Sequence, residues 1–306
     1  MEIRHRILEF SGQKKYDILK DELDKIGTHY EIKLLGSIGG IEKKSIEYWT
    51  TENDTLYPYI AKLIKKHKFY VQSGLYYSED DINSAEWLWA TAGEFQYPQP
   101  EDTYKEVTYD LSGYCQFCGI GKVQNNPFRL KTDFEQNGLH FLGLHWVFDE
   151  IFVRSEAKDI LENNHLDGIE FIHPILGKNL KPLDSVYQMK INTVVNPGLL
   201  TGDLETVTCK EHNEEVVSLK KAGITIHKYL GQDKRCGRVK YHYPLTKMIT
   251  FKRSTFCSSP DIVKSSEYFG SGAGANRLIL VSQKFVGVVK RNNLCGLNFT
   301  PIKLVE

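Results

Sequence analysis

The sequence has neither a long apolar run nor an excess of charge of either sign. No stretch approaches the roughly 18 consecutive apolar residues that a membrane-spanning helix needs. The segment EIRHRILEF after Met1 lacks the apolar core of a secretion signal. Lys plus Arg and Asp plus Glu both number 39, so no net field would attract a polyanion such as a nucleic acid. We therefore expect a globular cytoplasmic protein without a membrane partner.

Cysteine is also scarce, with six residues in 306, which is too few for a secreted disulfide scaffold. The signatures Gly-x-Ser-x-Gly and His-Glu-x-x-His are absent. Gly270, Gly272 and Gly274 precede the strand-like segment RLILVS, whereas nucleotide-binding glycines follow a strand and open a helix. We therefore predict that the protein is not an enzyme.

Strand-like and helix-like segments alternate through the first hundred residues. IRHRILEF alternates as a strand does, and KKYDILKDELDKIG spaces its apolar residues as a helix does before a terminating glycine. Residues 95–102, FQYPQPED, contain two prolines and few apolar groups, which is typical of a linker. The pattern predicts an α+β fold with mixed or antiparallel sheets and short helices. We place an N-terminal domain at 1–97 and a cysteine-containing domain at 103–306.

One internal repeat occurs in the second half of the chain. Residues 151–172, IFVRSEAKDILENNHLDGIEFI, align without gaps on residues 279–300, ILVSQKFVGVVKRNNLCGLNFT. Each copy carries apolar residues at helical spacing and then a glycine, Gly168 or Gly296. The repeat predicts two strand-helix-strand units whose glycines occupy a turn where a Cβ would be costly. Chance similarity between two such units is the alternative.

Cys115 and Cys118 stand in the fragment CQFCG, which is typical of a zinc knuckle. Such a turn supplies two ligands, and Gly119 allows the backbone to fold around the thiolates. A redox pair of thioredoxin type would open a helix instead. The following segment, GIGKVQNNPF, contains two glycines, two asparagines and a proline and predicts no helix.

The remaining metal ligands are less clear from the sequence. Cys209 and His212 share the two-residue spacing in TCKEHN, and Cys236 precedes Gly237 in DKRCG. A complete second knuckle would need a cysteine at position 233, where Asp233 stands. Three hypotheses follow: Asp233 completes the site, Cys209 or His212 reaches across an inserted hairpin, or the site is incomplete. Three thiolates and one further ligand would form a closed, structural zinc site.

With these segments identified, the chain resembles bacterial proteins of the double-CxxCG type. Its strand-helix-Gly-strand ending is similar to the terminal module of immunity proteins from polymorphic toxin systems. The resemblance implies a non-enzymatic binding protein that neutralises a cognate toxin, with zinc holding its fold. Asp233 departs from the family pattern at the second CxxCG. The matching residues are Cys115, Cys118, Gly119, WVFDEIFV at 146–153, Cys236, Gly237 and SSEYFGSGAGANRLILVSQKF at 265–285.

The competing hypothesis is a nucleic-acid-binding protein of the zinc-ribbon type. It would need a basic, aromatic face near the cysteines. The neutral overall charge argues against this reading. The basic residues that flank the two cysteine segments are Lys122, Arg129 and Lys131 near the first and Arg235, Arg238 and Lys240 near the second.

Overall fold

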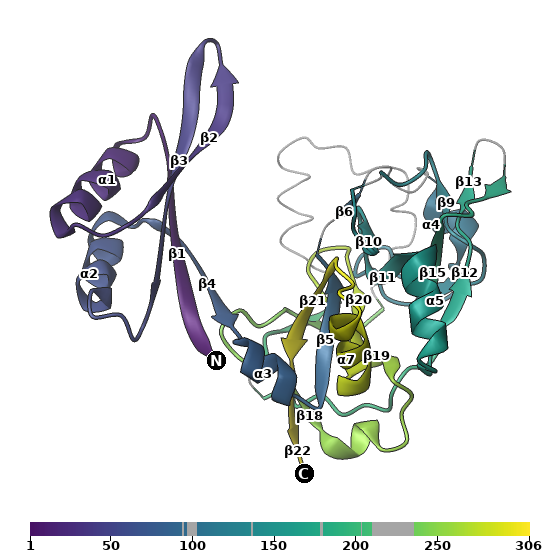
Figure 1. The fold of residues 1–306 in the computed structure, drawn as a ribbon. Coiled ribbons are helices and arrows are strands. Elements are labelled where there is room, and N and C mark those ends of the chain that lie inside the picture. Colours follow the sequence, from purple (N-terminus) through teal and green to yellow (C-terminus); the bar gives the residue numbers. More distant parts are fainter. Residues whose placement is uncertain (94, 97–102, 136, 178–179, 203, 210–235) are drawn as a thin grey trace. The chain divides into compact units, whose positions relative to one another are not determined.

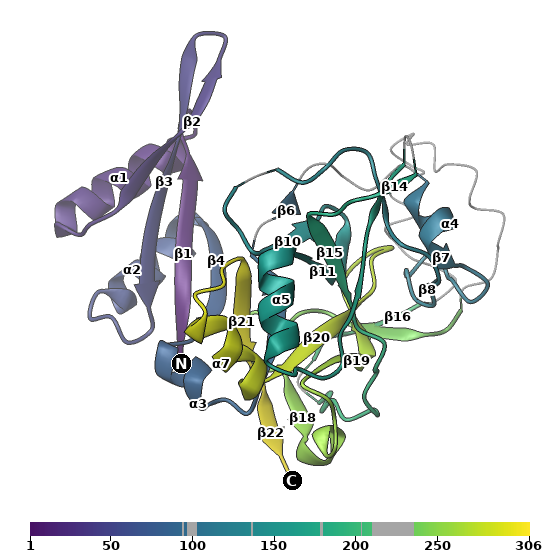
Figure 2. The ribbon, with the colours of Figure 1, turned by 45° about the vertical axis from the view of Figure 1, so that its right-hand side comes forward.

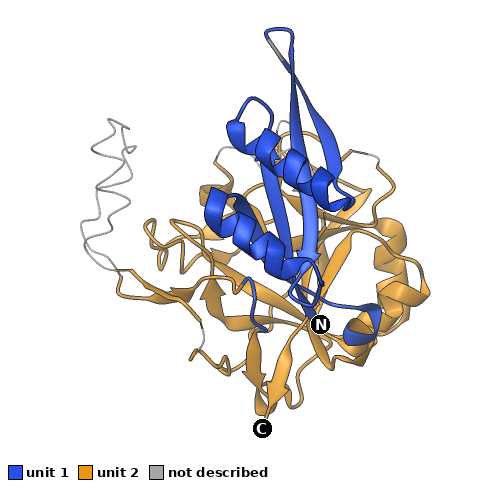
Figure 3. Ribbon diagram, turned by 90° about the vertical axis from the view of Figure 1, so that its left-hand side faces the viewer, with its two compact units in different colours: residues 1–81, 245–248 blue, residues 82–244, 249–306 orange. Residues whose placement is uncertain are grey.

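The computed structural model describes residues 1–306 except 94, 97–102, 136, 178–179, 203 and 210–235 (Figure 1). The chain divides into two compact units: unit 1 comprises 1–81 and 245–248, and unit 2 comprises 82–244 and 249–306 (Figure 3). The α+β fold with mixed and antiparallel sheets is the one that the sequence predicts.

The division between the units differs from the boundary expected at 97–103. It falls after Asp81, ahead of β5 (Trp87–Ala92). This strand pairs with β20 (Asn276–Ser282) and β21 (Leu297–Pro301) from the other end of the chain. The sequence pattern does not indicate this division, because it identifies a strand without identifying its partners.

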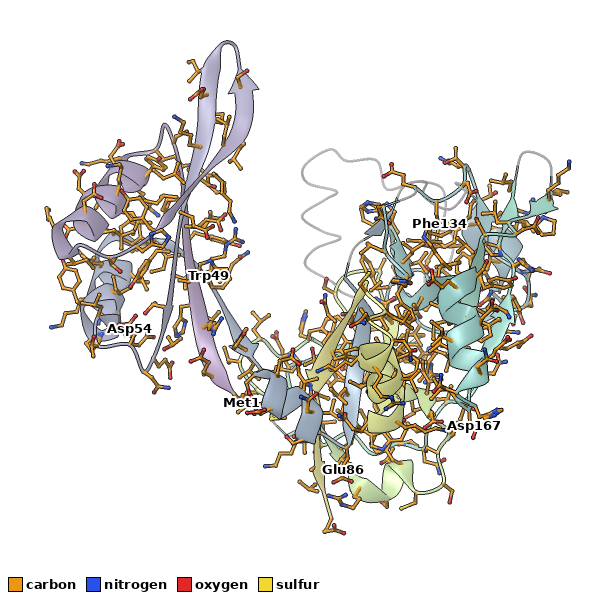
Figure 4. All side chains as sticks on the ribbon, viewed as in Figure 1. Met1, Trp49, Asp54, Glu86, Phe134 and Asp167 are labelled. Atoms are coloured by element: carbon orange, nitrogen blue, oxygen red, sulfur yellow. The ribbon has the colours of Figure 1, made fainter. Side chains whose placement is uncertain are left out.

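Unit 1 has the β-α-β-β-α-β order of a ferredoxin-like domain. Its sheet runs β2-β3-β1-β4 with antiparallel neighbours. The two helices pack on the same face of the sheet, where their side chains fill the core (Figure 4). The elements are β1 (Glu2–Phe10), α1 (Lys14–Ile26), β2 (Glu31–Ile38), β3 (Ile41–Thr51), α2 (Tyr57–His67) and β4 (Tyr70–Tyr76).

Helix α1 follows directly from its sequence. Leu19 and Leu23 stand one turn apart and are buried against the sheet. The helix ends at Gly27, whose φ of 63° is left-handed and whose amide donates to the Asp24 carbonyl (3.1 Å). A glycine in this conformation is the usual way to satisfy the last carbonyls of a helix.

Unit 2 contains the cysteines, the repeat and most of the strands. Its first elements are α3 (Glu79–Ser84), which crosses from unit 1, β5 and β6 (Phe95–Gln96). The remaining elements up to the repeat are α4 (Tyr104–Thr108), β7 (Tyr109–Asp110), β8 (Val123–Gln124), β9 (Arg129–Leu130) and β10 (Phe141–Leu144). Those from the first copy onward are β11 (Val147–Arg154), α5 (Ser155–Asn163), β12 (Glu170–Ile172), β13 (Ile175–Leu176), β14 (Lys181–Pro182), β15 (Val186–Lys190), β16 (Thr206–Thr208), β17 (Val239–Tyr241), β18 (Thr250–Lys252), a 3₁₀ turn (Arg253–Phe256), β19 (Ile262–Phe269), β20, α7 (Gln283–Arg291), β21 and β22 (Lys303–Val305).

The two copies of the repeat are β11-α5-β12 and β20-α7-β21, as the alignment predicts. A hairpin strand precedes each of them, β10 in the first half and β19 in the second. Helices α5 and α7 lie next to each other (Figure 2) and contribute to a single core. Their buried stripes, Ala157 with Leu161 and Phe285 with Val288 and Val289, are equivalent positions of the repeat.

The sheet of the second copy contains a strand from before the first copy. β5 lies before the first copy in the chain but between β20 and β21 of the second, whereas β15 lies between β11 and β12 of the first. The registers are the same: Ile151 faces Met189 and Ile279 faces Ala90 at equivalent positions. Unit 2 is therefore a pseudo-two-fold structure with a shared core. The second copy therefore depends on β5, from the other end of unit 2, to complete its sheet.

The turn glycines lie where the two halves meet. Gly168 has a φ of 97° and Gly296 a φ of 108°. An added Cβ would lie 2.3 Å from the Ile262 carbonyl oxygen at Gly168 and 2.2 Å from the Phe141 carbonyl oxygen at Gly296. Both positions therefore require glycine for conformation and for space.

Candidate metal centre

Four cysteines from three distant segments meet in unit 2. The sulfur atoms of Cys115, Cys118, Cys209 and Cys236 all lie within 4.8 Å of one another. Cys115 and Cys209 are 3.8 Å apart at sulfur, and Cys118 and Cys236 are 3.6 Å apart. The first three residues are buried and Cys236 is exposed. The described residues form no other cluster of three or more Cys, His, Asp or Glu with this geometry.

The first knuckle has the backbone geometry that its sequence predicts. The Cys115 amide donates to the Ile120 carbonyl (2.8 Å), and the Gly119 amide donates to the Cys115 carbonyl (2.7 Å). Gly119 has a φ of 81°, and a Cβ there would lie 2.3 Å from the Ala273 carbonyl oxygen. This tight turn aims both thiols at the same point.

The second knuckle repeats the first although 26 residues, 210–235, separate its cysteines. The Cys209 amide donates to the Arg238 carbonyl (2.9 Å), and the Gly237 amide donates to the Cys209 carbonyl (3.1 Å). Cys209 therefore corresponds to Cys115, and Cys236 to Cys118. Of the three hypotheses, the described structure brings Cys209 to the site.

The other two candidate ligands, His212 and Asp233, lie outside the described residues. A regular knuckle has two residues between its cysteines, so Asp233 is one of the three alternatives for the partner of Cys236. The structure instead pairs Cys236 with Cys209 across an insertion within the turn. The matching Cys-Gly ends of the two segments were the sequence signal for this correspondence.

A glycine loop and a buried lysine support the two knuckles. Lys240 is 1 % exposed, and its Nζ donates to the carbonyls of Cys118 (3.2 Å), Gly272 (2.6 Å) and Gly274 (2.7 Å). The Gly-rich segment before β20 therefore packs on the metal centre and directs carbonyls to an ammonium group. This arrangement does not resemble a phosphate loop, which would present amides to the ligand.

The cluster dimensions fit a tetrathiolate metal site. Zinc bonds sulfur at about 2.3 Å, so a tetrahedral site has sulfur-to-sulfur edges of about 3.8 Å. The Cys118–Cys236 and Cys115–Cys209 separations, 3.6 and 3.8 Å, match this edge, and all sulfur atoms lie within 4.8 Å of one another. A disulfide would require about 2.05 Å. A tetrahedral ion bound by all four thiolates would have no coordination position left for a substrate or water.

The cysteines differ in how readily they ionise before a metal binds. Burial, reinforced by the neighbouring Cys236 and Cys115, raises the pKa of Cys118 to about 12. Burial opposes ionisation of Cys236 too, but hydrogen bonds from the Arg238 amide and guanidinium outweigh it and lower its pKa to about 6. The exposed thiolate is thus the first ligand available, and binding must displace protons from the buried thiols.

A buried ionic network joins the first knuckle to the sheet of unit 2. Lys122 pairs with Asp149 (3.2 Å), and Lys264 pairs with Glu150 (2.6 Å). Glu150 also accepts a hydrogen bond from Gln188 (2.9 Å). The sequence pattern does not reveal this network, because Asp149 and Glu150 resemble exposed charges at a strand end but are buried within β11.

Two electrostatic effects act on this carboxylate pair. Burial opposes ionisation of Asp149, but Lys122 and Lys264 outweigh it and lower the pKa of that group. Burial dominates at Glu150 and raises its pKa, with the nearby Asp149 adding to the effect. The network therefore holds ionised groups in the interior only while both lysines stay in place.

No family model matches the sequence, and no curated protein matches it. Within the part of the chain that the structure describes, no helix is long and apolar enough to cross a membrane.

Proposed function

We propose that this chain is a non-enzymatic cytoplasmic binding protein whose unit 2 is stabilised by one structural zinc ion. The ligands are Cys115, Cys118, Cys209 and Cys236. The observation that carries the proposal is the closed set of four thiol ligands on two matching knuckles. A site without an open position supports a fold rather than a reaction.

The wider surroundings favour a stabilising role. Three segments far apart in the chain converge on the cluster, so a bound ion links the middle of the chain to its C-terminal half. Lys240 places a positive charge beside the first knuckle, and Arg238 hydrogen-bonds Cys236. Two positive charges offset the net charge of about −2 on zinc bound by four thiolates.

We infer that the binding partner is a protein, as for an immunity protein that neutralises a cognate toxin. The resemblance to double-CxxCG proteins supports this inference, and the split second knuckle explains its departure from their pattern. Cys209 takes the place of the missing first cysteine, and residues 210–235 are inserted in the sequence between Cys209 and Cys236. The insertion therefore leaves the two-knuckle arrangement intact.

The zinc-ribbon nucleic-acid hypothesis has less support, because three of the six basic residues that flank the cysteine segments have internal partners. Lys122 pairs with the buried Asp149, and Lys240 donates to backbone carbonyls. Arg238 donates to the Gly113 carbonyl (2.7 Å). Few cations of the described centre are left to contact phosphate groups, on which such binding depends.

Metal analysis tests the zinc proposal directly. We expect about one zinc per chain, with cobalt substitution giving the spectrum of a tetrahedral tetrathiolate. Cys209→Ser should reduce metal binding and destabilise unit 2, whereas Cys257→Ser, outside the centre, should change neither. A metal-free protein whose thermal unfolding is unaffected by chelation would refute it.

Partner binding is tested with the product of the gene encoded beside this one. Coexpression should protect cells from a toxic neighbour, and the purified proteins should form a complex that resists moderate salt. Binding to generic duplex DNA or RNA that weakens steeply with salt would instead favour the nucleic-acid hypothesis.

A further inference from the structure

One edge of the unit 1 sheet, at β2, is open within the described part of the chain. β2 stands at the end of the order β2-β3-β1-β4 and pairs there with β3 alone. Residues 31–37 of β2 are all exposed, and the hairpin that β2 forms with β3 extends past α1 (Figure 1). The opposite edge, at β4, is covered by the same chain, because the Leu75 amide donates to the Leu245 carbonyl (2.9 Å).

Backbone hydrogen bonds show which residues of β2 face the open edge. The Ser11 amide donates to the Lys44 carbonyl (2.8 Å), and the Lys44 amide donates to the Ser11 hydroxyl (2.8 Å). The Lys44 backbone therefore faces the β1 side of β3, so Leu34, opposite Lys44 in β2, forms a non-hydrogen-bonded pair with it. Since the two kinds of pair alternate along an antiparallel ladder, the Lys33 backbone faces β3, and the amides and carbonyls of Ile32 and Leu34 face outward.

This edge carries few of the features by which proteins protect a free strand. Protected edge strands are usually short, contain proline or a free lysine, or are twisted by a bulge. β2 has eight residues and no proline, and its bulge lies only after Leu34. Its one lysine, Lys33, is paired with the Glu47 carboxylate (3.0 Å). Ile32 and Leu34 are 46 % and 62 % exposed on the face of the sheet that carries the helices.

A second copy of β2 fits this edge in a specific antiparallel register. Two-fold pairing with Ile32 opposite Ile32 joins outward-facing backbone groups of both chains and places Glu31 of each chain opposite Lys33 of the other. Directly opposed side chains of opposite charge attract each other, whereas like charges repel. Moving the axis to residue 31 or 33 would instead oppose two glutamates or two lysines, and moving it to Leu34 would bring the bulge into the ladder.

We propose that unit 1 is a homodimerisation module in which the β2 strands of two chains pair antiparallel about a two-fold axis at Ile32. The pairing joins two four-stranded sheets into one continuous sheet. It also covers apolar surface, because Ile32 contacts its own copy and Leu34 lies opposite Tyr30, which packs against the unit 1 core. The proposal is independent of the metal centre and of the toxin partner.

Sedimentation of the full-length protein tests for the dimer. We expect the dimer fraction to rise with concentration, and a chain that stays monomeric up to about 0.5 mM would overturn the proposal. Glu31→Lys opposes two lysines at both equivalent positions, so the dissociation constant should rise at least about fivefold. Asp17→Lys makes the same change in net charge at an exposed position of α1 and should leave the dissociation constant unchanged. Equal effects of the two substitutions would refute the charge pairing.

Cysteine cross-linking tests the register without altering a charge. Ile32→Cys places two thiols across the axis at a Cα separation of about 5.5 Å, which a disulfide can span. Leu34→Cys is the matched control, because Leu34 is the more exposed residue but the register separates its two copies. After mild oxidation, peptide mass spectrometry should find the disulfide at position 32 and none at 34, above the background that the exposed Cys236, Cys257 and Cys295 give in the parent protein. A disulfide at position 34, or at neither position, would refute the register.

Ile32→Pro distinguishes this dimer from pairing with a strand of another protein. The substitution removes an outward-facing amide and keeps those that bond to β3, a position that an edge strand tolerates. We expect a monomer whose unfolding midpoint stays close to that of the wild type. A folded variant that still dimerises would contradict the proposal. A monomeric wild type whose complex with the neighbouring gene product is lost in Ile32→Pro would assign the edge to that partner and overturn the dimer.

Discussion

Replacing Lys264 by methionine should be among the most damaging single changes in unit 2. Its Nζ lies 2.6 Å from the Glu150 carboxylate, and the two side chains are only 11 % and 4 % exposed. At that distance the gross attraction is about 6 kcal/mol at an effective dielectric of about 20. Much of it is offset by desolvation, but removing one partner of a buried pair leaves the other charge uncompensated and costs about 3 to 5 kcal/mol. The free energy of unfolding of a domain is roughly 5 to 15 kcal/mol in total, so Lys264→Met should remove a large part of it.

The double variant isolates the pairing. Leu278 is the residue equivalent to Glu150 in the other half of unit 2, so Glu150→Leu introduces a side chain that the fold already accommodates at the related position. With both charges removed, two smaller defects remain: the Gln188 amide keeps Gln124 as an acceptor but loses Glu150, at a cost of at most about 1 to 3 kcal/mol, and Asp149 loses the nearby charge of Lys264. We therefore expect Lys264→Met/Glu150→Leu to be more stable than Lys264→Met alone.

Urea denaturation of the zinc-loaded protein, followed by fluorescence, measures all four members of the cycle. The slope of the free energy against urea should be similar in each, so that the midpoints report stability. A loss of unfolding free energy below about 1 kcal/mol for Lys264→Met would refute the buried pairing. Strict additivity of the losses caused by the two single changes would also refute it.

The remaining predictions concern the turns, the metal and acid stability. Gly168→Ala should lower the free energy of unfolding more than Gly27→Ala does. Both glycines have a left-handed backbone, which alone costs an alanine about 1 to 2 kcal/mol. Only at Gly168 does a carbonyl oxygen lie 2.3 Å from the added Cβ. Thermal unfolding measures both, and equal losses would contradict the steric argument. Removing zinc with a chelator at neutral pH should lower the melting temperature of unit 2, and calorimetry that shows no change would exclude a stabilising metal. Burial opposes ionisation of Asp261, but hydrogen bonds from Lys284, Ser282 and the Asp167 amide outweigh it and lower its pKa below 3.8. Its contribution is therefore present above about pH 4 and lost as the pH falls through the lower folded-state pKa, so Asp261→Asn should reduce the dependence of stability on pH in that acid range.

Local patterns were sufficient for much of the fold. The repeat at 151–172 and 279–300 predicted both helices and both turn glycines, because a buried stripe at helical spacing and a required glycine are properties of neighbouring residues. The fragment at Cys115 and Cys118 predicted its knuckle for the same reason. The pattern did not predict that β5 lies between β20 and β21, because the sequence of a strand does not specify which distant strand it pairs with.

The contrast between what the sequence determines and what the tertiary structure determines is clearest at the candidate metal centre. The sequence by itself determined two Cys-Gly turns and the number of ligands that a tetrahedral site needs. Only the tertiary structure showed that Cys209 forms the second turn with Cys236, because 26 residues separate the two cysteines in the sequence and backbone hydrogen bonds bring them together. It also decided that Asp149 and Glu150 are interior charges, since burial depends on the lysines that other segments bring to them.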